Sequence, residues 1–346
     1  MSGPEDYDYE LPEGRIATRP IRPRDAARLL LMRRDDPGSE IEHRQVRDLP
    51  EILTAGDRLV INETKVIPAR LRGRVLRSNR EIEVLLVRES SPGRWIAWVG
   101  PMRALQENDR ILFHGAGTIA SFEGREGEAA LLSFDGDVSS LIGARGHVPL
   151  PPYIGREDTP EDREDYQTIF ARVPGAIAAP TAGLHFTSDL LARLVEKGIG
   201  ITRVTLHVGP GTFRPLRCTD LGDHRVEPEY FSISAVAAGE IAETKAKGGR
   251  IVAVGTTSVR AIETWAETVD AFTSPAALEG WTDLTIVPPR VFRGVDCLMT
   301  NFHLPRSSLL VLVCAFAGRE RVLNAYAEAV SEGYRFYSYG DAMLIL

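Results

Sequence analysis

The spacing of apolar and polar residues changes character twice along the chain. Buried strands are predicted at residues 28–32 and 58–61, with a short helix at 49–53 between them. From residue 68 to 149 the pattern is β-like throughout, with six short runs separated by glycine and polar turns: 70–75, 81–87, 95–99, 110–113, 118–122 and 129–134. Beyond residue 187 helical and strand-like segments alternate again.

These changes predict a discontinuous α/β protein. Residues 1–67 and 150–346 should form an open α/β-sheet domain, and residues 68–149 a small antiparallel β-barrel inserted into it. In the second α/β segment we expect strands at 201–208, 250–254, 285–287 and within 335–344, a loop at 270–281, and helices at 189–197, 234–247, 259–268, 307–318 and 321–332.

Composition and charge narrow the possible classes of protein. Of the 346 residues 43% are apolar, yet no apolar run approaches the roughly 20 residues that span a bilayer. The acidic start does not have the pattern of a signal peptide, and the three widely spaced cysteines (Cys218, Cys297 and Cys314) fit a reducing cytoplasm and suggest no metal site. The net charge of −7 disfavours unspecific coating of nucleic acid, so RNA binding would need a local basic patch.

Such a patch is predicted on the first strand of the barrel. Arg70, Arg72 and Arg74 alternate with apolar residues or glycine, so the three side chains share one face. They could contact RNA phosphates, but a charged outer face on an edge strand explains the same pattern.

Residues 166–186 do not fit an ordinary element, because the density of Pro and Gly there prevents both a long helix and a central strand. Small apolar residues would let the backbone approach a ligand, and Thr181 and His185 are the polar side chains between Pro174 and Phe186. This composition favours a wall of a ligand site. A buried crossover loop with a hydrogen-bonded histidine is the alternative.

Polar residues also follow the predicted strands, where α/β sheets bind ligands. Asn62 and Thr64 lie at the end of one strand, and His207 lies near the end of another. Thr256, Thr257 and Ser258 follow a third strand at the start of a helix. A helix N-terminus favours a carboxylate or phosphate, although Thr and Ser are also ordinary caps. The segment 223–230 combines a histidine with carboxylates, which suits either acid–base chemistry or a solvated turn.

Eight segments spread in order along the chain resemble the S-adenosylmethionine:tRNA ribosyltransferase-isomerase family of queuosine biosynthesis. They are YDYELP, INETKVIPARLRG, PPYI, PGAIAAPTAGLHF, TLHVGPGTF, GTTSVRAIE, TNFHLPRSSLL and YRFYSYGDAML. The resemblance implies an α/β domain with an inserted barrel. It also implies transfer and isomerisation of the ribosyl group of S-adenosylmethionine onto 7-aminomethyl-7-deazaguanine at the tRNA wobble position. The products would be epoxyqueuosine-tRNA, adenine and methionine.

The resemblance also selects candidate site residues. Histidine is the usual acid or base near neutral pH, so the catalytic candidates are His185, His207 and His303, paired with Asp341 and Glu229. The substrate-binding candidates are Asn62, Thr64, Thr181, Gly183, Thr256, Thr257, Ser258, Arg260 and Asn301. Arg70, Arg72 and Arg74 are the candidates for tRNA. S-adenosylmethionine would be a co-substrate, no metal or membrane is expected, and the working expectation is a cytoplasmic monomer.

The chain departs from the family pattern at Pro210, Glu227 and Pro289. These departures are compatible with two other hypotheses: the chain is a relative that binds RNA without catalysis, or it is an enzyme with a different acceptor. A methyltransferase that uses S-adenosylmethionine is a third reading. The sequence does not contain the early strand, glycine loop and helix, followed by an acidic residue, that this reading needs.

Overall fold

The computed structural model describes residues 3–34, 36, 40–209, 211, 216, 218–268 and 270–346. Pro210, one of the three departures from the family pattern, lies outside the described residues. Thr212 and Phe213 of the same motif also lie outside them.

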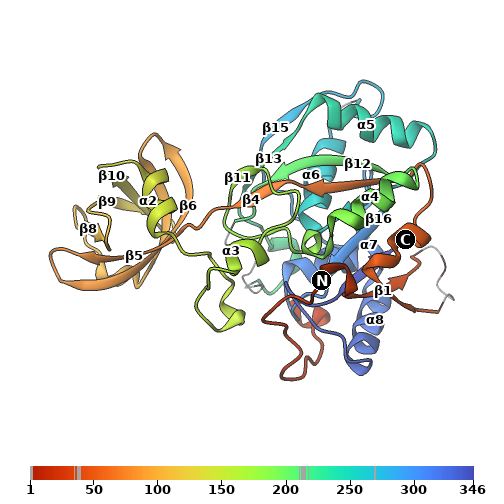
Figure 1. Ribbon diagram of the computed structural model, residues 1–346, viewed down its shortest axis with the longest axis horizontal. Coiled ribbons are helices and arrows are strands. Elements are labelled where there is room, and N and C mark those ends of the chain that lie inside the picture. Colours follow the sequence, from red (N-terminus) through yellow and green to blue (C-terminus); the bar gives the residue numbers. More distant parts are fainter. Residues whose placement is uncertain are drawn as a thin grey trace.

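A nine-stranded mixed sheet forms the larger part of the molecule (Figure 1). Its central strands β12, β3, β14 and β16 run parallel, and antiparallel pairs flank them. In spatial order the strands are β15 (Leu278–Thr282), β13 (Glu229–Ile233), β12 (Gly200–Leu206), β3 (Arg58–Asn62), β14 (Ile251–Val254), β16 (Cys297–Asn301), β17 (Ala342–Ile345), β1 (Arg28–Met32) and β2 (Glu42–Gln45).

Helices cover both faces of this sheet because its central strands are apolar on both faces. In β3, Leu59 and Ile61 pack on one face while Val60 packs on the other. One face is covered by α1 (Leu49–Ile52) and α4 (Ser188–Glu196). The opposite face is covered by α5 (Ala235–Ala246), α6 (Thr256–Ala266), α7 (Ser308–Ala317) and α8 (Arg319–Ser331).

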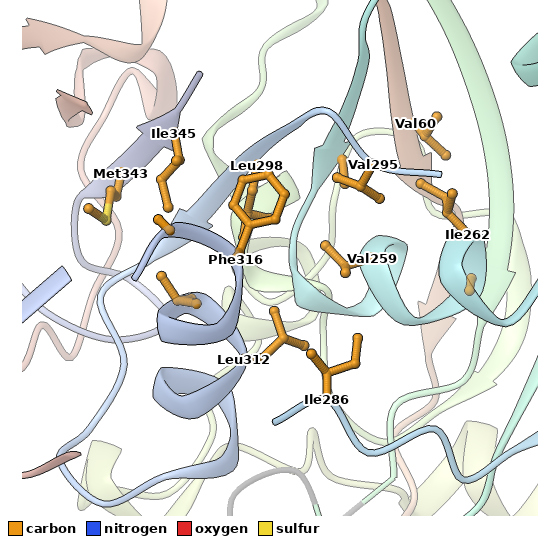
Figure 2. Packing of buried hydrophobic residues seen from close by; sticks show 14 of the residues in the cluster. Val60, Val259, Ile262, Ile286, Val295, Leu298, Leu312, Phe316, Met343 and Ile345 are labelled. Atoms are coloured by element: carbon orange, nitrogen blue, oxygen red, sulfur yellow. The ribbon is translucent and has the colours of Figure 1, made fainter. Parts of the chain in front are cut away.

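The larger core lies between the sheet and α6 and α7. Figure 2 shows side chains of both helices beside Leu298 of the central strand β16. Val259 and Ile262 come from α6, and Leu312 and Phe316 come from α7. This packing fixes the N-terminus of α6 against the carboxyl end of β14, which is where the candidate site begins.

The inserted unit is a closed six-stranded barrel that stands to one side of the α/β domain (Figure 1). Its inward side chains, such as Leu71 and Val75, form a separate apolar core. The strands are β5 (Arg70–Val75), β6 (Arg80–Ser91), β7 (Arg94–Gly100), β8 (Arg110–Phe113), β9 (Ile119–Glu126) and β10 (Ala129–Phe134), and α2 (Val138–Arg145) follows them. The short pair β4 (Thr64–Val66) and β11 (Val173–Ala176) lies in the segments that join the two parts, together with α3 (Asp162–Asp165).

The predicted fold class, an α/β sheet with a small antiparallel barrel, is confirmed. Three local predictions are wrong. Residues 278–281, the end of the loop predicted at 270–281, lie in β15, because pairing with β13 stabilises a short edge strand whose own pattern is weak. Residues 285–287 do not form a strand, and the last strand begins only at Ala342 because residues 335–341 make a compact aromatic turn.

Candidate active site at the strand ends

A cavity of about 980 Å³ lies between the α/β domain and the barrel. The carboxyl ends of the parallel strands form one wall, with His207, Thr256 and Thr257. The barrel supplies the opposite wall, including Val87, Arg88, Trp95, Trp98 and Glu126. A cavity of this size at the carboxyl edge of an α/β sheet is the usual place for a small-molecule site.

His207 is the predicted histidine that lines this cavity. It directly follows β12, and its Nδ1 lies 2.7 Å from Oγ1 of Thr64, which follows β3. Its ring stacks on that of Tyr230, with centroids 5.5 Å apart. A Cβ on Gly175 would come within 2.6 Å of Nε2, so this position of the ring needs glycine there. Burial lowers the pKa of His207, which keeps the ring neutral and able to accept a proton.

The N-terminus of α6 forms a second polar wall of the cavity. Gly255, with φ of +88°, turns the chain from β14 into the helix, so the first backbone N–H groups of α6 have no partner within the helix. Thr257 is 8% exposed, and its buried hydroxyl has no hydrogen-bond partner in the described structure. Ser258 instead donates to the carbonyl of Val254 and is fully buried. Thr256 and Thr257, rather than Ser258, therefore lie where a ligand could bind.

Glu229 and Arg260 line the cavity but are bonded to each other. The guanidinium of Arg260 contacts the Glu229 carboxylate and also donates to the carbonyls of Thr282 and Leu284. Glu229 also accepts from the backbone N–H of Gly209 at 2.7 Å. Both side chains are almost fully buried, so the pair fixes α6 against β13 and β15.

Three other predicted residues form a hydrogen-bonded network, and a fourth, His303, lines a small hollow next to it. Asn301 accepts from the hydroxyl of Thr181 at 2.9 Å, and its amide lies 3.2 Å from Nε2 of His185. Nε2 of His303 lies 2.8 Å from Oγ1 of Thr300. A small hollow of about 30 Å³, large enough for about one water, separates Thr181, Asn301 and His303 from Thr257.

Burial lowers the pKa of His303 to about 3. Burial, with smaller effects of Arg335 and Arg24, lowers the pKa of His185 to about 3 as well. Both rings are therefore neutral near pH 7 and weak bases.

Three predicted residues do not line the cavity, and their hydrogen bonds or packing contacts are to other parts of the protein. Asn62 clamps β3 to β12 by exchanging hydrogen bonds with the backbone of Leu206. Gly183 lies so close to Phe170 that a Cβ would come within 2.8 Å of its ring. Asp341 accepts from the backbone N–H groups of Arg28 and Arg335, and the structure does not bring it to a histidine of the site.

The three barrel arginines share one face of β5, as their alternation predicts, but they do not line the cavity. Arg70 donates to the carbonyl of Leu150 and lies 3.6 Å from Glu83. Arg72 pairs with Glu157 at 2.5 Å. Arg74 lies opposite Glu81 in the ladder. Carboxylates therefore balance part of this basic surface.

Several cavity residues were not predicted from the sequence, namely those of the barrel and Trp281. Trp281 lies opposite Tyr230 in the pairing of β15 with β13, in a segment predicted as loop. Among the described residues, five carboxylates and two guanidinium groups line the cavity, so its wall is acidic: Glu89, Glu126, Glu128, Glu227 and Glu229 against Arg88 and Arg260. No short motif joins these distant residues.

Comparison with known proteins places the chain in a family. The model of the queuosine biosynthesis protein family matches residues 4–345. The S-adenosylmethionine:tRNA ribosyltransferase-isomerase of Anaeromyxobacter sp. (strain K) is 51% identical over 99% of this chain and 98% of its own length. Its namesake from Thermus thermophilus is 50% identical over the full length of both chains. The chain therefore belongs to the queuosine biosynthesis protein family.

A solved structure supports the same assignment. The crystal structure of S-adenosylmethionine tRNA ribosyltransferase from Thermotoga maritima has a TM-score of 0.56 and 36% sequence identity, and it covers 99% of this chain and 100% of its own. In the part of the chain that the structure describes, no helix is both long and apolar enough to cross a membrane. Those residues also contain no cluster of three or more His, Cys, Asp or Glu that could hold a metal ion.

Proposed function

We propose that this protein transfers and isomerises the ribosyl group of S-adenosylmethionine onto 7-aminomethyl-7-deazaguanine in tRNA, giving epoxyqueuosine-tRNA, adenine and methionine. The observation that carries the proposal is the cavity of about 980 Å³ that brings His207 and the N-terminus of α6 together. It occurs in a chain that matches the queuosine biosynthesis family from residue 4 to 345. A tRNA acceptor implies a cytoplasmic enzyme.

The charges of the cavity fit both substrates. S-adenosylmethionine carries a cationic sulfonium, and the aminomethyl group of the acceptor base is a cation at neutral pH. An acidic wall attracts both groups, and the cavity has more carboxylates than guanidinium groups among its described residues. S-adenosylmethionine supplies the ribosyl group, and its sulfonium acidifies the protons on the adjoining carbon.

The N-terminus of α6 is the proposed site for the methionine carboxylate. Its first backbone N–H groups point out of the helix, and the helix dipole favours an anion there. The buried hydroxyl of Thr257 has no hydrogen-bond partner in the described structure and could donate to the same carboxylate. Thr256 lies beside it, while Ser258 holds the turn through the carbonyl of Val254.

His207 is the proposed general base or acid. Thr64 fixes its Nδ1, and the lack of a side chain at Gly175 allows the Nε2 edge of the ring to lie close to that backbone. The lowered pKa favours a neutral ring that can remove a proton from a substrate carbon. The strand ends are supported by hydrogen bonds of four buried or partly buried residues: Asn301, Thr181, His185 and His303. The ion pair of Glu229 with Arg260 holds α6 against β13. Arg70, Arg72 and Arg74 are proposed contacts for tRNA phosphates outside the cavity.

Release of adenine tests the proposal. Purified protein is incubated with S-adenosylmethionine and tRNA that carries 7-aminomethyl-7-deazaguanine, and adenine is measured by chromatography. Adenine that forms only with the modified tRNA supports ribosyl transfer. If folded protein that binds this tRNA releases no adenine, the enzyme assignment fails in favour of an RNA-binding relative. A methylated product instead would indicate a methyltransferase.

A further inference from the structure

An aromatic path leads from the cavity wall to the surface of the protein. The ring of His207 stacks on Tyr230, and Tyr230 contacts Trp281 edge-on with centroids 6.0 Å apart. Trp281 is 54% exposed, whereas an aromatic side chain of this size is usually mostly buried. All three residues line the same cavity, so Trp281 marks its outer rim.

A guanidinium from the barrel covers one face of this exposed indole. Arg88 of β6 lies over the Trp281 ring with its Cζ 5.2 Å from the centroid, within cation–π range. The same guanidinium contacts Glu126 of β9 at 3.0 Å. Arg88 therefore spans the cavity mouth, because its own strand belongs to the barrel and Trp281 belongs to the edge of the large sheet.

Arg88 can leave the Trp281 ring at little cost in free energy. The side chains of Arg88 and Glu126 are 40% and 57% exposed, so both are solvated and their ion pair contributes little to stability. If Arg88 leaves the indole, its ion pair with Glu126 can persist. The face of Trp281 then becomes available to another flat, polarisable group, and a nucleobase stacks on aromatic rings whatever its identity.

We propose that Trp281 is the stacking site for an unpaired base that flanks the modified base in the anticodon loop, and that this base displaces Arg88 from the indole. The proposal rests on the proposed function for its RNA acceptor. The modified base itself must reach deeper, toward His207 and the N-terminus of α6. The exposed rim therefore suits its neighbour in the strand. Stacking there would hold the loop open over the cavity.

Binding of a synthetic anticodon stem-loop RNA tests the subsite without any need for turnover. Trp281→Ala should weaken this binding about tenfold, as expected for the loss of one stacked base. Trp281→Phe should stay within about threefold of the wild type, because phenylalanine keeps a stacking face. Binding of S-adenosylmethionine, measured by calorimetry, should be unchanged in both variants. Val236→Ala, at a 71% exposed apolar residue outside the cavity, is the control for altered surface.

Arg88→Met separates base stacking from a mere contact between the two parts of the molecule. If a base displaces Arg88, the methionine variant binds the stem-loop as tightly as the wild type or more tightly. If Trp281 serves only to hold Arg88 in place, Arg88→Met weakens binding of the stem-loop as much as Trp281→Ala does, and the proposal is overturned. Wild-type affinity in a folded Trp281→Ala protein overturns it as well.

Abasic stem-loops identify the stacked base. One stem-loop does not contain the base on the 5′ side of the target position, and another does not contain the base on the 3′ side. For one of the two, binding to the wild type should weaken while binding to Trp281→Ala does not weaken further. Additive losses on both sides contradict the subsite. These readouts are separate from adenine release. A wild type that releases no adenine but shows this coupling loses the proposed activity and keeps the base subsite.

Discussion

Two histidines follow the carboxyl ends of strands in the same sheet, yet their surroundings differ. His207 follows β12 and lines the large cavity, with the hydroxyl of Thr64 at its Nδ1 and the backbone of Gly175 close to its Nε2. His303 follows β16 and is 5% exposed. The hydroxyl of Tyr9 donates to its carbonyl at 2.5 Å, and the hydroxyl of Tyr326 accepts from its N–H at 3.0 Å.

Position at a strand end does not by itself create a catalytic group. The N-terminal segment and α8 cover His303, and this burial lowers its pKa to about 3. His207 is only partly covered, because the barrel stands off from the sheet and leaves a cavity. We therefore assign acid–base chemistry to His207, and support of the strand ends to His303 and His185.

The largest expected effect concerns stability in acid. The pKa of His185 and that of His303 are about 3 when folded, against about 6.5 for an ordinary histidine. Between these two pH values the unfolded chain therefore binds more protons than the folded chain. The contribution of the two neutral histidines to the free energy of unfolding is complete above pH 6.5 and decreases as the pH falls toward 3. Each histidine should contribute a loss of about 1.4 kcal/mol per pH unit within that window.

Urea unfolding between pH 7 and 5 measures this slope while most carboxylates stay ionised. In His303→Gln the slope should decrease by the contribution of one histidine. Parallel curves for the wild type and the variant would show that His303 is not buried as a neutral ring.

The next effect concerns Gly175. A methyl group there would come within 2.6 Å of Nε2 of His207, and the φ of +147° also disfavours any residue with a side chain. Gly175→Ala should displace the imidazole and lower kcat about 100-fold, since misplacement of a catalytic group by about 1 Å has effects of this size. Gly143→Ala is the matched control, because a Cβ at that helical position meets open space. Equal kcat values in the two variants would show that Gly175 does not fix the position of a catalytic imidazole.

A smaller effect is expected for Thr257→Val, which removes the buried hydroxyl and keeps the shape. If this hydroxyl donates to the methionine carboxylate, its loss should raise KM for S-adenosylmethionine about tenfold and leave kcat and KM for tRNA nearly unchanged. Steady-state kinetics in each substrate separate these constants. A selective increase of KM for tRNA would place the hydroxyl at the acceptor instead.

The smallest effect is expected on the barrel. Arg72 is paired with Glu157, so Arg72→Gln should raise KM for tRNA no more than about threefold and leave kcat unchanged. If Arg72 contacts a phosphate, the slope of log affinity against log salt should become about one unit shallower. An unchanged slope would argue that the RNA crosses the barrel elsewhere.

The local pattern of apolar and polar residues predicted much of the fold. Period-two alternation and glycine turns located the barrel strands, and β8 and β10 fall at the predicted residues. Helices with clear caps, such as α5 after Ser234 and α7 after Ser307, lie within one residue of their predicted starts. The missed strand β15 depends on tertiary pairing with β13, which a single segment does not encode locally.

The site was harder to predict, because motifs show which residues matter but not what covers them. The sequence placed His185, His207 and His303 on equal terms, and only the packing of the N-terminal segment and α8 separates them. Asp341 lies in a matched motif, yet its carboxylate is bonded to the backbone of Arg28 and Arg335. Arg88 and Trp281 come from segments 193 residues apart without a shared pattern, so their contact becomes visible only in the fold.

The most direct test of the assignment of acid–base chemistry to His207 compares kcat for adenine release in His207→Gln and His303→Gln. We expect His207→Gln to lower kcat at least 100-fold without a large change in Tm, since it removes the acid–base group. His303→Gln should lower Tm and keep kcat within about tenfold of the wild type, because it removes a buried support. A folded His207→Gln enzyme with wild-type kcat, beside an inactive but folded His303→Gln enzyme, would contradict the assignment and move the chemistry to the buried network.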